Sequence, residues 1–131
     1  GNCIYLLDEE KVLRKKVMRA VTDEGPQAPN SPMSEPIKNL FTLLELVSTP
    51  DKVQFFTDAY NDCSIRYGDL KKEIAQDILN ITTPIRERII DIQNDEEYLS
   101  KVVRMGAEKA RERASKTLEE VRQIMGIKRF Y

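Results

Sequence analysis

The chain contains no histidine and only two cysteines, Cys3 and Cys63. The two cysteines lack the paired spacing of a zinc site, so we interpret them as isolated thiols. There is also no glycine-rich phosphate loop, and no nucleophile and base are identifiable by their spacing. The sequence therefore predicts no catalytic centre, metal site or cofactor site of its own.

Long apolar runs are missing as well. No segment approaches the roughly 20 apolar residues that a membrane span needs, and no signal peptide opens the chain. The 131 residues are 40% hydrophobic and 33% charged, which is typical of one soluble domain with a modest core. We therefore expect a cytoplasmic protein with no membrane partner. The net charge is −1, so any basic surface has to come from local clustering.

The first third of the chain divides into three parts. Residues 3–7 are apolar and predict a short strand or an extended arm. Asp8 is then a candidate N-cap for a helix that ends near Val21. Residues 22–36 contain four prolines, which exclude a continuous helix and predict a long surface loop.

Helical spacing returns after this loop. Ser34 is a candidate cap for a helix over 37–47, and Ser48 or Thr49 for the next one, with Pro50 in its first turn. Asp69 is a candidate cap for a long helix with an inward-facing isoleucine stripe, which we expect to kink at Pro84.

The final part of the chain predicts one further helical region. Asn94 and Asp95 separate it from the preceding helix, Gly106 is expected to interrupt it, and Gly126 to end it. Alanines between residues 107 and 114 are expected to face a neighbouring helix. The fold class is therefore mainly α, a helical bundle, with at most the short strand or arm at the N-terminus.

Charged residues suggest an interaction surface more than chemistry. The acidic groups at 8–10 and 95–97 lie at expected helix starts, where the helix dipole explains them. Basic residues cluster on expected helix faces. The interleaved glutamates favour a solvated face for them, and contacts with an RNA backbone are the alternative. Tyr67 could stack on a base, or it could be packed beside Gly68. The candidate RNA-binding residues are Lys71, Lys72, Arg86, Arg88, Lys109, Arg113 and Lys116.

Several short motifs occur in the order of one enzyme family. They are Tyr-Gly-Asp-Leu-Lys at 67–71, Thr-Pro-Ile-Arg-Glu-Arg at 83–88 and Met-Gly-Ala-Glu-Lys-Ala at 105–110. Upstream lie Ile-Tyr-Leu-Leu-Asp at 4–8 and Val-Thr-Asp at 21–23. In this order, the chain resembles the C-terminal region of bacterial-type tryptophanyl-tRNA synthetases. The related tyrosyl enzymes fit the motifs at 21–23 and 67–69 less well.

The resemblance implies a particular place in a larger enzyme. Such a synthetase is a class I enzyme with a Rossmann catalytic domain, which uses ATP and Mg²⁺ to activate tryptophan and then charges tRNA(Trp). It is expected to act as a homodimer. Neither its His-Ile-Gly-His nor its Lys-Met-Ser-Lys-Ser type signature is present here, so catalytic residues have no positions to map onto. Residues 1–131 are expected to begin just after the second signature.

This resemblance also gives the expected domain organisation. We expect one C-terminal helical domain over 1–131, composed of a segment that follows the ATP-binding signature (1–21), the Pro-rich loop (22–36) and a helical bundle (37–131). It is expected to bind tRNA(Trp), to contact the rest of the synthetase and to be inactive alone. The alternative is a free-standing helical module that binds another protein.

Overall fold

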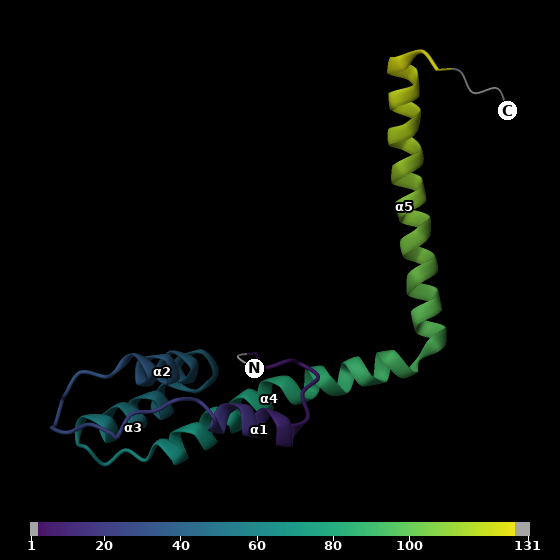
Figure 1. Cartoon of the computed structure of the whole chain (residues 1–131). Coiled ribbons are helices and arrows are strands. Elements are labelled where there is room, and N and C mark those ends of the chain that lie inside the picture. Colours follow the sequence, from purple (N-terminus) through teal and green to yellow (C-terminus); the bar gives the residue numbers. More distant parts are fainter. Residues whose placement is uncertain (1–2, 128–131) are drawn as a thin grey trace. The chain divides into compact units, whose positions relative to one another are not determined.

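The computed structural model describes residues 3–127, and in this range it contains α-helices and no strands (Figure 1). The predicted mainly α fold is confirmed. The helices are α1 (Glu10–Met18), α2 (Glu35–Val47), α3 (Pro50–Asn61), α4 (Tyr67–Asn94) and α5 (Glu96–Met125). Residues 3–9 form an irregular arm with a turn at residues 6 and 7, so of the two alternatives for this segment the strand is wrong.

The chain divides into two compact units. The first is Gly1–Glu87 and the second is Arg88–Tyr131, so α4 contributes residues to both. The single domain expected over 1–131 stays a prediction. Among the described helices, none has the length and apolar content to cross a bilayer.

The first unit has one hydrophobic core, to which all four of its helices contribute. Leu13, Ile37, Leu44, Leu70 and Ile74 are its largest fully buried side chains. Burying such a side chain stabilises the fold by about 1.5–3 kcal/mol relative to leaving it exposed. The other buried apolar residues are Val17, Leu40, Phe41, Phe56, Tyr60, Ala75, Ile78 and Leu79.

Helix starts follow the predictions in part. Ser34 and Thr49 are N-cap residues, as expected, but neither side chain makes a capping hydrogen bond. Asp8 does not cap α1, whose N-cap is Glu9. The Asp8 carboxylate instead accepts hydrogen bonds from the Tyr5 backbone and from Lys16 Nζ. The prediction that Asp69 caps the long helix is also wrong, because α4 begins two residues earlier, at Tyr67.

The isoleucine stripe of α4 is only partly core. Its buried residues end at Leu79, whereas Ile81 is 47% and Ile85 40% exposed. The helix continues through Pro84 to Asn94. Helical spacing alone therefore predicted the helix correctly, but it overestimated how far the core follows it.

The second unit contains the end of α4 and all of α5. The Asp95 side chain accepts a hydrogen bond from the Tyr98 backbone N–H at 2.8 Å, which confirms the predicted helix start. Gly126 ends α5 in the left-handed conformation, with φ at 68°. The interruption predicted at Gly106 is wrong, because α5 is continuous there. No residue of α5 is buried, so the inward-facing alanines expected from the sequence are also wrong for the described chain.

Candidate nucleic-acid interface

The most regular basic row lies on α5. Lys109, Arg113 and Lys116 follow one another at steps of four and three residues, so they share one face, and all three are exposed. At about 100° per residue, Arg113 lies only about 60° around the helix from Ala110. The basic row therefore borders the alanine face and does not lie opposite it.

Glutamates are interleaved with this row but do not neutralise it. Within residues 3–127, no ion pair involves a side chain of α5. The ammonium and guanidinium groups of the row are therefore not engaged by carboxylates of the described residues. Exposed cations at this spacing can contact successive phosphates of a polynucleotide.

Arg86 and Arg88 do not form one cluster. Two residues apart on a helix correspond to about 200°, so their side chains leave α4 on different sides. Arg86 is half-buried and belongs to the first unit, whereas Arg88 is exposed and belongs to the second. Their closeness in the sequence therefore does not translate into a shared surface.

The adjacent lysines Lys71 and Lys72 have different environments. Lys71 is 8% exposed, and its Nζ donates a hydrogen bond of 2.7 Å to the carbonyl oxygen of Ala20. Its ammonium thus satisfies a backbone acceptor after α1, and we remove Lys71 from the candidate RNA-binding residues. Lys72 has a 69% exposed side chain that makes a 3.2 Å ion pair with Asp69, and it stays a candidate.

Tyr67 is also engaged within the chain. Its hydroxyl donates a 2.7 Å hydrogen bond to Asp23, and its ring packs at the edge of the core. Burial and the neighbouring Asp23 carboxylate both raise the pKa of Tyr67. The structure therefore favours the packed tyrosine over the base-stacking alternative.

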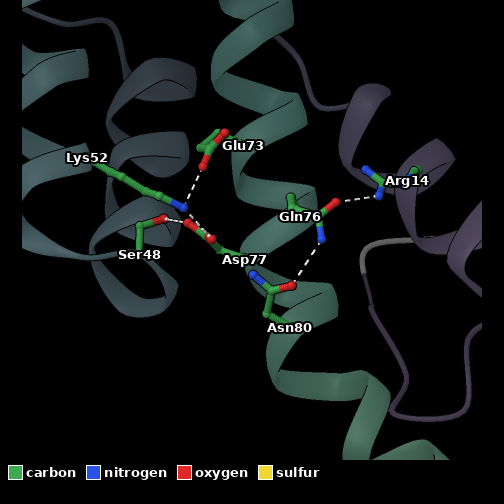
Figure 2. A network of polar contacts seen from close by, with 7 residues as sticks. All are labelled: Arg14, Ser48, Lys52, Glu73, Gln76, Asp77 and Asn80. Carbon is green, nitrogen blue, oxygen red and sulfur yellow. Dashed lines mark hydrogen bonds and ion pairs between the residues drawn. The ribbon is translucent and has the colours of Figure 1, made fainter.

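Sequence reasoning missed a polar network that connects segments of the first unit (Figure 2). Lys52 Nζ on α3 lies 2.6 Å from Asp77 Oδ1 and 2.5 Å from Glu73 Oε1, both on α4. Ser48 donates a 2.6 Å hydrogen bond to the second oxygen of Asp77. Nearby, Gln76 accepts a 2.6 Å hydrogen bond from Arg14 of α1 and donates one to Asn80.

The charges of this network stabilise one another. Burial opposes ionisation of Asp77, but hydrogen bonds from Lys52 and Ser48 outweigh it, and the pKa of Asp77 lies below its ordinary value. The same hydrogen bond from Lys52 to Asp77, with a second one to Glu73, raises the pKa of Lys52. Because these groups satisfy one another, the network connects α3 to α4 and offers no free group for chemistry. No spacing rule connects positions 21 to 29 residues apart, so the sequence carried no signal for it.

The described part of the chain contains no cluster of metal-ligating side chains. Residues 3–127 contain no group of three or more acidic or cysteine side chains that could hold a metal ion. Cys3 and Cys63 are exposed free thiols. An open hollow of about 710 Å³ in the first unit is bordered by Ala20, Val21, Pro36, Asn39, Leu40 and Leu43, a set without an ionisable side chain.

Comparisons with known proteins identify relatives of this chain. A scan of protein-family models finds no match. A tryptophan–tRNA ligase of Porphyromonas gingivalis is 59% identical over 128 residues, which cover 98% of this chain and 39% of that protein. Tryptophan–tRNA ligase 1 of Streptomyces coelicolor is 38% identical, over 95% of this chain and 36% of that protein.

A solved structure has the same fold. Tryptophanyl-tRNA synthetase from Campylobacter jejuni, in complex with ADP and tryptophan, matches with a TM-score of 0.76 and 21% identity. The match covers 92% of this chain and 37% of that protein. The resemblance inferred from the motifs is thereby confirmed, and nearly the whole chain matches a segment spanning about 36–39% of the length of tryptophanyl-tRNA synthetases.

Proposed function

We propose that this chain is the C-terminal, tRNA-binding part of a tryptophan–tRNA ligase. The observation that carries the proposal is the 59% identity to a tryptophan–tRNA ligase along 98% of the chain. The parent enzyme would activate tryptophan with ATP and Mg²⁺ and transfer it to tRNA(Trp) in the cytoplasm. Its Rossmann catalytic domain would supply those steps. We expect this domain to precede the chain, with its Lys-Met-Ser-Lys-Ser type signature directly before residue 1.

The role of this chain would be to hold the anticodon side of the tRNA. The exposed row on α5 and the exposed Lys72 and Arg88 support this role, because exposed surface cations attract a phosphate backbone. Half-buried Arg86 completes the proposed set. The full set of proposed contacts is Lys72, Arg86, Arg88, Lys109, Arg113 and Lys116.

Two measurements test this function. The chain alone is expected to bind a tRNA(Trp) transcript in gel-shift titrations, with an affinity that falls steeply with added salt. It is also expected to give no tryptophan-dependent exchange between ATP and pyrophosphate, whereas the parent enzyme gives it. If the purified chain gives more ATP–pyrophosphate exchange than a mock purification, the proposal that catalysis belongs to the other domain is wrong. Absence of salt-dependent tRNA binding would contradict the RNA-binding role.

The alternative of a protein-interaction module is favoured by one observation, the absence of buried residues on α5. The parent gene distinguishes the two. A catalytic domain encoded directly upstream supports the synthetase, and an unrelated upstream sequence supports the module. The parent synthetase is further proposed to be a homodimer.

A further inference from the structure

The backbone hydrogen bonds of α4 are interrupted in the second half of the helix. Pro84 has no N–H, so the carbonyl oxygen of Asn80 lacks its helical donor four residues further on. The hydroxyl of Thr82 also donates a 2.9 Å hydrogen bond to the carbonyl oxygen of Ile78. Such a side-chain bond competes with the helical one and often bends a helix. The helix is therefore weakest between residues 78 and 84.

Packing does not compensate for this interruption. The buried residues of α4 end at Leu79, and no described residue after Leu79 is buried. Thr83 and Pro84 are both exposed. The boundary between the two compact units lies just beyond them, between Glu87 and Arg88. Because a segment with few buried contacts opens at a low free-energy cost, this part of α4 can bend without disturbing the core.

The junction between α4 and α5 is, by contrast, held by hydrogen bonds on both sides. The backbone N–H of Asp95 donates to the carbonyl oxygen of Ile92 at 3.2 Å, and the Asp95 carbonyl oxygen accepts from the Leu99 N–H at 3.0 Å. The Asp95 side chain also accepts from the Tyr98 N–H. The weakest point in the connection between the two units is therefore inside α4, and not where α4 ends.

We propose that residues 80–87 are a hinge, at which α4 bends and the second unit changes its orientation to the first. The candidate RNA contacts Lys72 and Arg86 precede the unit boundary, whereas Arg88 and the basic row of α5 follow it. The hinge thus lets both groups of cations reach one RNA without a fixed spacing between them, a use that rests on the proposed function. The hinge itself needs no RNA and is tested first without it.

Distances between spin labels, measured by double electron–electron resonance, test the hinge in the whole 131-residue chain. One label pair spans Pro84, with one label on the exposed Cys63 and the other on Glu108→Cys, while Cys3 is changed to Ser. The wild type is expected to give a broad distance distribution. Pro84→Ala is expected to make it at least about twofold narrower, because alanine restores the N–H donor and removes the ring that clashes with the Asn80 carbonyl.

Two controls locate the motion. A second label pair, Asp91→Cys with Glu108→Cys in a chain whose native cysteines are changed to Ser, spans the junction of α4 and α5 but not Pro84. Its distribution is expected to be narrow with and without Pro84→Ala. Gly106→Ala also favours a helix, and its added Cβ would meet no atom within 4 Å. Because Gly106 lies outside the hinge, this substitution is expected to leave both distributions unchanged.

The hinge is wrong if the wild-type distribution across Pro84 is narrow, if Pro84→Ala does not narrow it, or if the second label pair is as broad as the first. Equal narrowing by Gly106→Ala would also overturn it, since the flexibility would then be spread along α5.

A final measurement separates the hinge from the proposed function. Saturating tRNA(Trp) transcript is expected to narrow the wild-type distribution across Pro84. A transcript that binds in gel shifts without narrowing it would overturn the use of the hinge in RNA binding. A transcript that does not bind at all would count against the proposed function, and the hinge would then be decided by the distributions without RNA.

Discussion

Tyr67 and Asp23 are 44 residues apart in the sequence, yet the tyrosine hydroxyl lies 2.7 Å from the aspartate Oδ1. The same carboxylate accepts hydrogen bonds from Ser34 and from the backbone of Gly25. Asp23 therefore attaches both ends of the proline-containing loop to the start of α4. Hydrogen bonds from Ser34 first, and then from Tyr67, hold the pKa of Asp23 below its ordinary value.

This relationship makes Tyr67→Phe informative. The substitution keeps the ring but removes the donor, so we expect the free energy of unfolding to fall by about 1 kcal/mol. Urea unfolding at neutral pH measures the change. Tyr98→Phe is the control, because Tyr98 is 44% exposed on α5. Equal stability losses in the two variants would argue against a stabilising Tyr67–Asp23 bond.

The polar network between α3 and α4 predicts a larger effect. Lys52→Met removes the cation that faces Asp77, whose side chain is only 7% exposed. Because a nearly buried carboxylate loses its charged partner, we expect a loss of about 2 kcal/mol in urea unfolding. Lys38→Met removes an exposed pair with Glu35 and is expected to cost less than about 1 kcal/mol. Similar losses for the two lysines would contradict the role given to the network.

The same network predicts a pH dependence with a definite sign. The folded-state pKa of Asp77 is lowered from 3.8, so its ionised form stabilises the fold above that pH. This contribution is lost as the pH falls through the still lower folded-state pKa. We expect the stability difference between the wild type and Asp77→Asn to be largest near neutral pH and to shrink once the pH drops below about 4. A difference that grows on acidification would contradict this assignment.

Adjacent lysines are expected to behave differently. Lys71→Met should lower the free energy of unfolding, because the hydrogen bond from the nearly buried Lys71 to the Ala20 carbonyl is lost. It should leave the salt dependence of tRNA binding unchanged. Lys72→Met should leave stability nearly unchanged, since its pair with Asp69 is exposed, and should weaken tRNA binding slightly. Urea unfolding and gel shifts on both variants measure the four outcomes. If Lys71→Met weakened tRNA binding and Lys72→Met lowered the free energy of unfolding instead, Lys71 and not Lys72 would be the RNA contact.

These two lysines also show what the sequence could predict. Helical spacing located α2 and α3 and the length of α4, because apolar periodicity is a local property of the chain. It could not distinguish Lys71 from Lys72 as RNA contacts, since that depends on which side of α4 receives the segment after α1. The network around Asp77 could not be predicted for the same reason, because its partners Ser48 and Lys52 lie on segments far away in the sequence. The continuity of α5 through Gly106 was missed because one glycine weakens a helix by only about 1 kcal/mol, which its neighbours can outweigh.

The basic row on α5 gives the most direct test of the RNA surface. Changing Lys109, Arg113 and Lys116 to Glu removes three exposed cations that no carboxylate of the described chain engages. Each phosphate contact contributes about 0.7–0.9 to the slope of log affinity against log salt, so we expect tRNA binding to weaken and the slope to decrease by about 2. Gel-shift titrations at several salt concentrations measure both quantities.

The matched control carries the same charge change on α1. Lys11 and Lys15 of α1 and its C-cap Arg19 are exposed, and their change to Glu lowers the net charge by the same amount. If the α5 row follows the RNA backbone, the α5 variant loses more affinity and more slope than the α1 variant, while both keep the helical circular dichroism of the wild type. If the two variants weaken binding equally, the attraction depends on total charge alone. In that case the α5 row is a solvated face, as the interleaved glutamates allow.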